Sequence, residues 1–252
     1  MNENQKQTFG LIGKVLSYSF SKKYFEQKFL EEGLSNCVYE NFELEEIAAF
    51  AHLIKNTTNL KGLNVTIPYK TKVIPFLDEL DEAAKAIGAV NTIKPIDGKL
   101  FGYNTDVVGF KNSIKPLLQK HHTKALILGT GGAAKAVKYV FGKMGIGYQS
   151  VSRSEKEAVI TYNNINEAIL NEHYIIINTT PLGTFPAVEN CPALPYKHLN
   201  HKHLLYDLVY NPTKTTFLKK GKEKGATIKN GLEMLELQAE ASWNIWNDFS
   251  ES

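Results

Sequence analysis

The segment GTGGAA at residues 129–134 constrains the fold of this chain more than any other feature. It follows the apolar segment ALILG (125–129), which predicts a buried strand, and leads into AAKAVKYVFGKMG (133–145), which predicts a helix. A glycine-rich turn in this position has the G-x-G-x-x-G/A pattern of dinucleotide-binding folds. Gly129 permits the tight turn, Gly131 lets the backbone approach a pyrophosphate, and the last alanine allows close helix packing. The helix N-terminus then favours phosphate binding, so we prefer this interpretation over a purely structural glycine turn.

Predicted strands and helices alternate along the chain, which indicates an α/β protein. Apolar patterns predict strands at 9–13, 37–42, 63–67, 125–129, 148–152, 174–178, 204–210 and 226–230. Helical spacing predicts helices at 21–34, 42–56, 78–89, 133–145 and 231–246, and a further helix from about 106. A strand pair over 90–106 turns at Asp97-Gly98, and Ser21 is the expected cap of the first helix. The later strands are almost continuously apolar and separated by crossovers, so they predict a parallel sheet covered on both faces.

Composition argues against several classes of protein. The 252 residues are 43% hydrophobic and 22% charged, as in ordinary globular proteins, and the net charge of +3 argues against nucleic-acid binding. Cys37 and Cys191 lie far apart and fit no metal or redox spacing, which favours a reduced setting. No apolar run is long enough for a membrane span, and the polar N-terminus MNENQKQT has no apolar signal region. We therefore expect a cytoplasmic protein without nucleic-acid or membrane partners.

The residues after the second strand of the dinucleotide unit indicate which cofactor it binds. An NAD site places an acidic residue about 20 residues beyond the glycines, to bind the ribose 2′-OH. This chain has Ser152, Arg153 and Ser154 there instead. A guanidinium can pair with a 2′-phosphate and stack on adenine, while the serines add hydroxyl donors, so the segment predicts NADP. Two observations leave room for alternatives: Glu155 lies close by, and Arg153 could be an ordinary surface residue.

Polar residues of the first hundred positions gather where predicted strands end. Each has an ordinary interpretation alone, such as a helix cap for Ser21 and Asp106 or a turn for Asn91. Together they occur where α/β folds place ligand groups. They are Ser17, Ser19, Ser21, Asn64, Thr66, Lys70, Asn91, Thr92, Asn104, Thr105 and Asp106. We therefore expect the first part of the chain to present a substrate to the cofactor.

Nine segments carry a specific resemblance to a known family. In chain order they are GKVLSYSFS, NVTIPYK, GAVNT, YNTDVVGF, GTGGAAKA, SRS, INTTPLG, DLVYNPTKT and NGLEMLELQA. Their order and spacing are similar to those of shikimate dehydrogenases, from about residue 9 to 246. The resemblance implies an N-terminal substrate-binding domain at 1–105, completed by a C-terminal helix at 237–252, and a Rossmann-like NADP-binding domain at 106–236. It also implies NADPH-dependent, reversible reduction of 3-dehydroshikimate to shikimate, on the route to chorismate and aromatic amino acids.

The resemblance also assigns roles to individual residues. It places Lys70 and Asp106 as the catalytic pair, with Lys70 stabilising charge on the reacting oxygen and Asp106 orienting it or sharing the proton. Which of the two is the formal acid stays open. The implied substrate-binding residues are Ser19, Ser21, Asn64, Thr66, Asn91, Tyr210 and Gln238. The implied cofactor-binding residues are Gly129, Gly131, Gly132, Ala133, Ser152, Arg153, Ser154, Thr180 and Gly231.

This chain departs from the family pattern, and other functions compete with the first. Tyr18 and Lys22 stand where the family commonly has His and Pro, and Ser152 replaces an asparagine of the adenosine-phosphate site. A quinate or dual quinate/shikimate dehydrogenase is the nearest alternative, although two intact serines favour shikimate. A non-catalytic NADP-binding regulatory module is disfavoured because Lys70 and Asp106 are both present. We expect no metal site, since no carboxylate or cysteine accompanies the histidines at 198, 201 and 203. A monomer and a homodimer both remain open.

Overall fold

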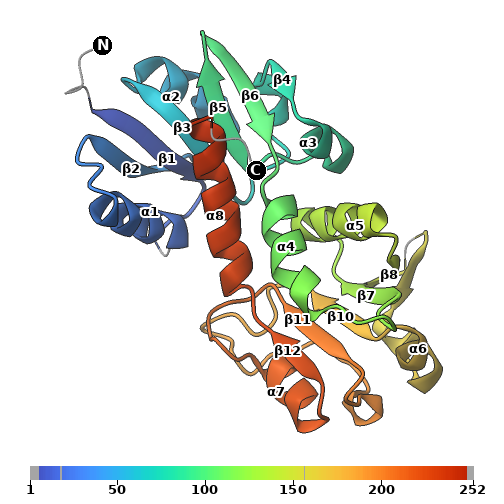
Figure 1. The fold of residues 1–252 in the computed structure, drawn as a ribbon. Coiled ribbons are helices and arrows are strands. Elements are labelled where there is room, and N and C mark those ends of the chain that lie inside the picture. Colours follow the sequence, from blue (N-terminus) through green and yellow to red (C-terminus); the bar gives the residue numbers. More distant parts are fainter. Residues whose placement is uncertain (1–5, 18, 156, 249–252) are drawn as a thin grey trace. The chain divides into compact units, whose positions relative to one another are not determined.

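The computed structural model describes residues 6–17, 19–155 and 157–248. The chain divides into two compact units. Met1–Thr105 together with Gln238–Ser252 form the first unit, and Asp106–Leu237 form the second unit. Figure 1 labels most helices and strands of both units. Each unit contains one six-stranded sheet with helices, so the predicted α/β class is confirmed.

The first unit is built on a mixed sheet with the strand order β2-β1-β3-β5-β6-β4. Its strands are β1 (Gln7–Gly13), β2 (Cys37–Glu43), β3 (Leu60–Val65), β4 (Glu79–Leu80), β5 (Thr92–Ile96) and β6 (Lys99–Tyr103). Its helices are α1 (Phe20–Glu31), α2 (Phe50–Asn56) and α3 (Glu82–Ile87), with short 3-10 helices at Ile47–Ala49 and Ile74–Phe76. The strands β1, β2 and β3 run parallel, whereas β5 pairs antiparallel with β3 and β6. The hairpin between β5 and β6 turns at Asp97-Gly98, both with positive φ, as predicted.

Apolar side chains cover both faces of this first sheet. Ile12, Leu63 and Ile93 belong to the core on one face. On the other face, Phe9 and Phe25 pack against Trp246 of the helix α8 (Leu232–Trp246), with ring centroids 5.1 and 5.4 Å away. The helix α8 therefore begins in the second unit and ends as part of the core of the first.

The second unit has a fully parallel sheet with the order β12-β11-β10-β7-β8-β9. Its strands are β7 (Lys124–Leu128), β8 (Gly147–Ser152), β9 (Val159–Thr161), β10 (Ile175–Asn178), β11 (Leu204–Asp207) and β12 (Thr227–Lys229). Its helices, besides the start of α8, are α4 (Asp106–Ile114), α5 (Gly132–Met144), α6 (Glu167–Glu172) and α7 (Thr216–Glu223). Short 3-10 helices lie at Lys115–Leu117, Tyr162–Asn164 and Tyr196–His198.

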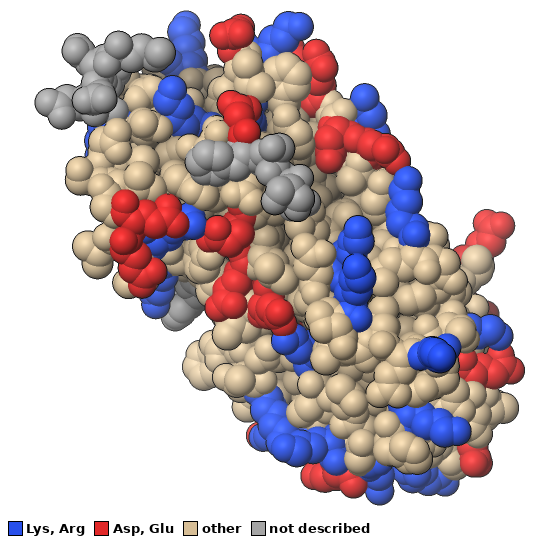
Figure 2. Space-filling model, viewed as in Figure 1, with Lys and Arg blue, Asp and Glu red and all other residues tan. Residues whose placement is uncertain are grey.

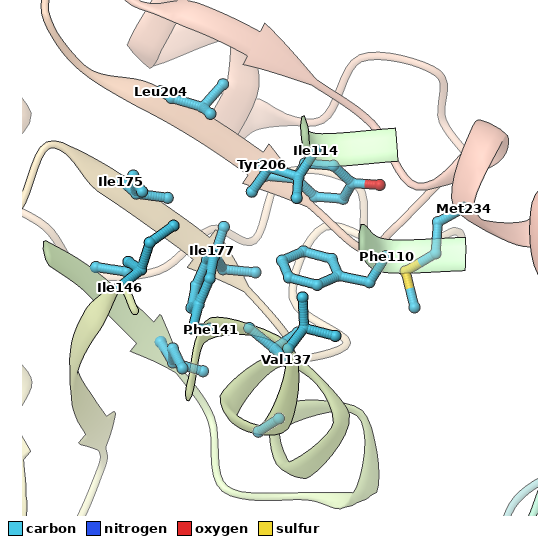
Figure 3. Close-up of a cluster of buried hydrophobic side chains, with 14 residues drawn as sticks. Phe110, Ile114, Val137, Phe141, Ile146, Ile175, Ile177, Leu204, Tyr206 and Met234 are labelled. Carbon is cyan, nitrogen blue, oxygen red and sulfur yellow. The ribbon is translucent and has the colours of Figure 1, made fainter. Parts of the chain in front are cut away.

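Helices cover both faces of this parallel sheet, as its continuous apolar strands predicted. Ile127 of β7 packs with residues of α4 and α5, whereas its neighbour Leu126 packs with residues of α6 and α7. Figure 3 shows the first of these cores. There the ring of Phe110 contacts those of Phe141 and Tyr206, each at a centroid distance of 5.4 Å. This core anchors α4 and α5 at fixed positions on the sheet.

The end of β3 differs from the prediction. The strand stops at Val65, and the chain then turns, with the Tyr69 N–H donating to the Thr66 carbonyl at 2.8 Å. Ile67 does not continue the buried face of the strand but is 78% exposed. Pro68 lacks a backbone donor, which suits the turn and not a central strand.

Several helix boundaries also differ. The helix α1 is capped by Ser19, whose side chain accepts a hydrogen bond from the Lys22 N–H at 3.4 Å, so Ser21 lies inside the first turn. Segment 42–56 is helical only from Ile47, because Phe42 and Glu43 pair with β1. Segment 78–89 is helical only at α3, because Glu79 and Leu80 pair with β6. The strand β9 and the helices α6 and α7 were not predicted.

Charge is mixed on the molecular surface, since acidic and basic side chains both occur across the face shown in Figure 2. Within the described ranges, no helix combines the length and the apolar character that crossing a membrane requires.

Candidate active site

The glycine-rich turn of the second unit has the geometry of a phosphate cradle. Gly129 has a φ of +112°, and a side chain there would also collide with the hydroxyl of Thr179. Gly131 is the N-cap of α5, and Gly132 is the first residue of that helix. A β-carbon on either of these two residues would meet no other atom within 4 Å, so the space in front of the helix N-terminus is open. Backbone N–H groups at such a terminus fit the pyrophosphate of a dinucleotide.

The alanines that follow place the helix close to the sheet. Ala134 is fully buried in the core beneath α5, as the motif predicted, and Ala133 is half-buried. A larger residue at position 134 would push the helix away from β7 and open the turn.

The Ser-Arg-Ser segment begins at Ser152, the last residue of β8, and continues into an exposed turn. The Ser152 hydroxyl donates to the Ser154 carbonyl and accepts from the Ser154 N–H at 3.2 Å, which closes a small turn. Arg153, Ser154 and Glu155 are all exposed. The positive charge of Arg153 acts on Tyr162, whose pKa is raised by burial and lowered in part by that charge. A guanidinium and a hydroxyl are therefore accessible here, while the Ser152 hydroxyl serves the turn itself.

Thr180, Tyr210 and Gly231 lie in the loops that follow β10, β11 and β12. The Thr180 hydroxyl donates to Asn178 at 2.6 Å, and Tyr210 is half-buried, with its pKa raised by burial. A β-carbon on Gly231 would collide with the Leu208 carbonyl, so only glycine fits this close approach of two loops. Because parallel strands end at one edge of a sheet, these loops share the edge that carries the glycine turn after β7.

A buried cluster of amides and hydroxyls brings together three predicted substrate residues of the first unit. Asn91 donates to the Gln238 side chain at 3.3 Å and to the Thr105 hydroxyl at 3.0 Å. Asn64 donates to the Ser242 hydroxyl at 3.0 Å, and that hydroxyl lies 3.2 Å from the Thr105 hydroxyl. All five side chains are at least 92% buried. The cluster therefore joins β3, the segment before β5, the segment before α4 and the helix α8.

Sequence reasoning missed two members of this cluster. Ser242 is fully buried and bonds to Asn64, Thr92 and Thr105. Tyr39 donates from its hydroxyl to the Asn64 side chain at 2.7 Å. A serine one helical turn after Gln238 was the available signal for Ser242, since both residues then face the same way. No comparable signal marked Tyr39, which resembles any apolar residue of a strand.

The start of α1 places the two predicted serines differently from one another. Ser19 caps the helix, whereas Ser21 shares a hydrogen bond with Tyr39 and so connects to the cluster around Asn64. The Lys22 ammonium lies 3.3 Å from Glu40 and 3.7 Å from Glu26. Lys22, which replaces a proline of the family pattern, is therefore paired with carboxylates of its own unit.

Lys70 follows the turn after β3 in the first unit. Its carbonyl accepts a hydrogen bond from the Val90 N–H at 2.7 Å, which ties the turn to the segment before β5, and its side chain is half-buried. Thr66 is half-buried in the same turn. Asp106 is the first residue of α4 and is 8% exposed. The division of the chain places Lys70 in the first unit and Asp106 at the start of the second.

Two of the three histidines considered above as metal ligands, His198 and His203, have other partners. His198 lies 3.3 Å from Glu167, and the fully buried His203 bonds to backbone groups of Asn200 and Leu170. Across the described ranges, no three His, Cys, Asp or Glu side chains are grouped so as to hold a metal ion.

Comparisons with known proteins give one consistent result. The family described as "Shikimate dehydrogenase substrate binding domain" matches residues 11–93. A shikimate dehydrogenase (NADP(+)) of Caldicellulosiruptor bescii is 37% identical over 94% of this chain and 88% of its own length. The shikimate 5-dehydrogenase of Thermus thermophilus, solved with NADP(H) and shikimate, superimposes with a TM-score of 0.85 at 27% identity, covering 98% of this chain and 95% of that one. A quinate dehydrogenase of Corynebacterium glutamicum, solved with NAD, gives a TM-score of 0.84 at 28% identity, covering 97% and 95%.

Proposed function

The chain belongs to the shikimate dehydrogenase family, and we propose that it reduces 3-dehydroshikimate reversibly to shikimate with NADPH. This reaction lies on the route to chorismate and the aromatic amino acids. The observation that carries the proposal is the buried cluster containing Asn64, Asn91 and Gln238. Such amide and hydroxyl groups suit a polyhydroxylated ring, and they belong to a chain whose other unit has an open phosphate cradle.

In this proposal the first unit, completed by the end of α8, binds the substrate, and the second unit binds NADP. The N-terminus of α1, with Ser19 and Ser21, suits the substrate carboxylate, because a helix N-terminus attracts anions. Thr66, Asn64 and Asn91 suit the ring hydroxyls, together with Gln238. Tyr210 of the second unit completes the proposed substrate contacts.

The proposed cofactor contacts all lie in the second unit. Gly129, Gly131, Gly132 and Ala133 present backbone groups to the pyrophosphate, and Thr180 and Gly231 border the same edge of the sheet. Ser152, Arg153 and Ser154 receive the adenosine 2′-phosphate, with Arg153 supplying the positive charge. When bound, NADPH supplies the hydride, so the protein has to orient the two rings and manage one proton.

Lys70 and Asp106 manage that proton in the proposed mechanism. The Lys70 ammonium stabilises negative charge on the carbonyl oxygen as it develops and passes a proton to it. Asp106 orients the ammonium or shares the proton.

A steady-state assay that crosses shikimate and quinate with NADP and NAD tests the proposed function. We expect the highest kcat/KM with shikimate and NADP. Activity with quinate and NAD but none with shikimate and NADP would instead favour a quinate dehydrogenase, the function that the similarity to the Corynebacterium glutamicum enzyme supports second. No turnover with any pair would favour the non-catalytic regulatory module. We further propose a cytoplasmic enzyme, acting as a monomer or a homodimer.

The variant Lys70→Ala tests the assignment of the proton. We expect kcat to fall by about 10²–10⁴-fold, the usual contribution of a positioned acid or base. Lys72→Ala is the matched control, because Lys72 is an exposed lysine two residues further along the same segment. A Lys70→Ala enzyme with near-normal kcat and unchanged KM would contradict the assignment.

A further inference from the structure

Asp207, which has no role in the proposed function so far, is a fully buried acidic residue of the second unit. It is the last residue of β11, and its register partner on β10 is Asn178. Both side chains are fully buried at the carboxyl ends of their strands. The loop after β10 carries Thr180, and the loop after β11 carries Tyr210. The residue pair therefore lies at the base of two loops of the proposed site.

The Asp207 carboxylate accepts three hydrogen bonds from the surrounding chain. Its Oδ1 accepts from the Asn178 amide at 2.9 Å and from the Val209 N–H at 3.0 Å. Its Oδ2 accepts from the Thr215 hydroxyl at 2.6 Å. Val209 and Thr215 lie on either side of Tyr210, so the carboxylate fixes both ends of the loop that carries this tyrosine. Thr215 is also the N-cap of α7, through the Leu218 N–H.

Asn178 extends the network into the other loop. Its side-chain oxygen accepts from the Thr180 N–H at 3.0 Å and from the Thr180 hydroxyl at 2.6 Å. Its amide donates to Asp207 and, more weakly, to the Leu182 carbonyl at 3.4 Å. The bond to Asp207 determines which way the Asn178 amide faces, because the nitrogen has to point at the carboxylate. The Asn178 oxygen is thereby directed at Thr180.

We propose that Asp207 is a positioning residue, whose ionised carboxylate holds the loops carrying Thr180 and Tyr210 in the arrangement that binds cofactor and substrate. This inference rests on the proposed function. The carboxylate contacts neither ligand in this scheme; it acts through Asn178, Val209 and Thr215. A full set of acceptors exists only in the ionised form, because a proton on either oxygen turns an acceptor into a donor.

The surroundings make this arrangement sensitive to pH. Burial raises the pKa of Asp207 to about 6, although the bonds from Thr215, Val209 and Asn178 lower it in part. All three donors are uncharged, and the Asp207 charge acts on the phenol of Tyr196. The carboxylate is thus ionised at neutral pH and takes up a proton as the pH falls through about 6, which releases part of the network.

The main test compares Asp207→Asn with the wild-type enzyme from pH 5 to pH 8. Direct NADPH titration gives Kd without turnover, and steady-state assays give KM and kcat. At pH 7.5 we expect the variant to bind NADPH about tenfold more weakly, since small misplacements of binding groups are costly. Towards pH 5 the ratio of variant to wild-type Kd should approach one, because the wild type then carries a neutral side chain as well. A ratio that stays constant with pH would overturn the proposal.

Two further measurements separate positioning from folding. Hydrogen exchange of segments 179–183 and 208–215 should be faster in Asp207→Asn at pH 7.5, while its thermal unfolding midpoint should not fall, because the variant buries no charge. Ser113→Ala is the matched control, since it removes another buried hydrogen bond of the second unit, from Ser113 to Tyr206 at 2.7 Å. We expect it to leave the Kd ratio and both segments unchanged. Unaltered exchange in Asp207→Asn would contradict the proposal even if the enzyme acted on another substrate.

If Asp207→Asn does not fold, variants of Thr215, whose hydroxyl donates to Oδ2 of Asp207, test the proposal instead. Thr215→Val removes the hydroxyl but keeps the shape of the side chain, whereas Thr215→Ser keeps the donor. We expect weaker NADPH binding in Thr215→Val and near-normal binding in Thr215→Ser. Equal binding by the two variants would overturn the proposal. Wild-type NADPH binding without shikimate turnover would instead contradict the proposed function alone.

Discussion

Replacement of Gly62 by alanine tests how α8 is held on the first unit. Gly62 lies in β3, and a β-carbon there would lie closer than 3.0 Å to three atoms of the Trp246 indole. The indole cannot move freely, because it is 5% exposed and contacts the rings of Phe9 and Phe25. Its Nε1–H also donates to the Ile93 carbonyl at 3.1 Å. The new methyl group therefore has to displace a fixed ring.

The size of the effect follows from these contacts. Forcing a methyl group into a packed core costs about 1–3 kcal/mol. Breaking the bond from Trp246 to Ile93 leaves buried polar groups unpaired, which costs roughly 1–3 kcal/mol more. Replacing glycine in the unfolded chain returns only about 0.4–1 kcal/mol. We therefore expect the first unit to lose about 1–6 kcal/mol of stability, with a central value of about 3 kcal/mol. That is a large part of the ~5–15 kcal/mol typical of a protein.

Urea unfolding followed by tryptophan fluorescence measures this loss. The chain has two tryptophans, and both Trp243 and Trp246 lie in the part of α8 that belongs to the first unit. Gly142→Ala is the control, because a methyl group at this α5 position would meet nothing within 4 Å. It should leave the fluorescence transition unchanged. Since α8 also carries Gln238, we expect Gly62→Ala to raise KM for shikimate and to leave Kd for NADPH unchanged. If the free energy of unfolding derived from the fluorescence transition of Gly62→Ala lies within about 0.5 kcal/mol of the wild-type value, the packing argument is refuted.

Two other predictions concern the second unit. Arg153→Gln should raise KM for NADPH by about 10–100-fold, which is the effect of losing a hydrogen bond to a charged group. It should leave KM for NADH nearly unchanged, because NADH lacks the 2′-phosphate. Equal changes of KM for both cofactors would exclude a contact between Arg153 and the 2′-phosphate. Acid should destabilise the protein through His122 and His203, because burial lowers the pKa of both side chains below the usual 6.5. The contribution of the two neutral imidazoles to the free energy of unfolding is therefore complete above pH 6.5 and is lost as the pH falls below it. Urea unfolding at pH 7.5 and 5.5 measures this loss, which should be smaller in His203→Gln; an equal loss in that variant would show that other groups cause it.

The elements that were predicted correctly from the sequence are those whose structure is determined by residues close together in the chain. The turn at GTGGAA needs glycine for a positive φ at Gly129 and an open N-terminus at Gly131, and both requirements are local. Continuous apolar runs predicted β7, β10 and β11, because a strand buried on both faces has no polar positions. The strand β4 escaped prediction, since its two residues carry too little periodicity. Ser21 was the expected cap of α1, but the backbone geometry at Ser19 decided otherwise.

The sequence by itself thus determined the fold class, the dinucleotide turn and, through nine segments, the family. Only the tertiary structure decided which polar groups meet. Ser242 bonds to Asn64 across 178 positions of the chain, and Asp207 bonds to Asn178 across 29. The DLVY segment alone did not show that the Asp207 carboxylate is buried among uncharged donors. The physical reason is that periodicity and turn chemistry act over a few residues, whereas the partner of a buried polar group is selected by the packing of distant elements.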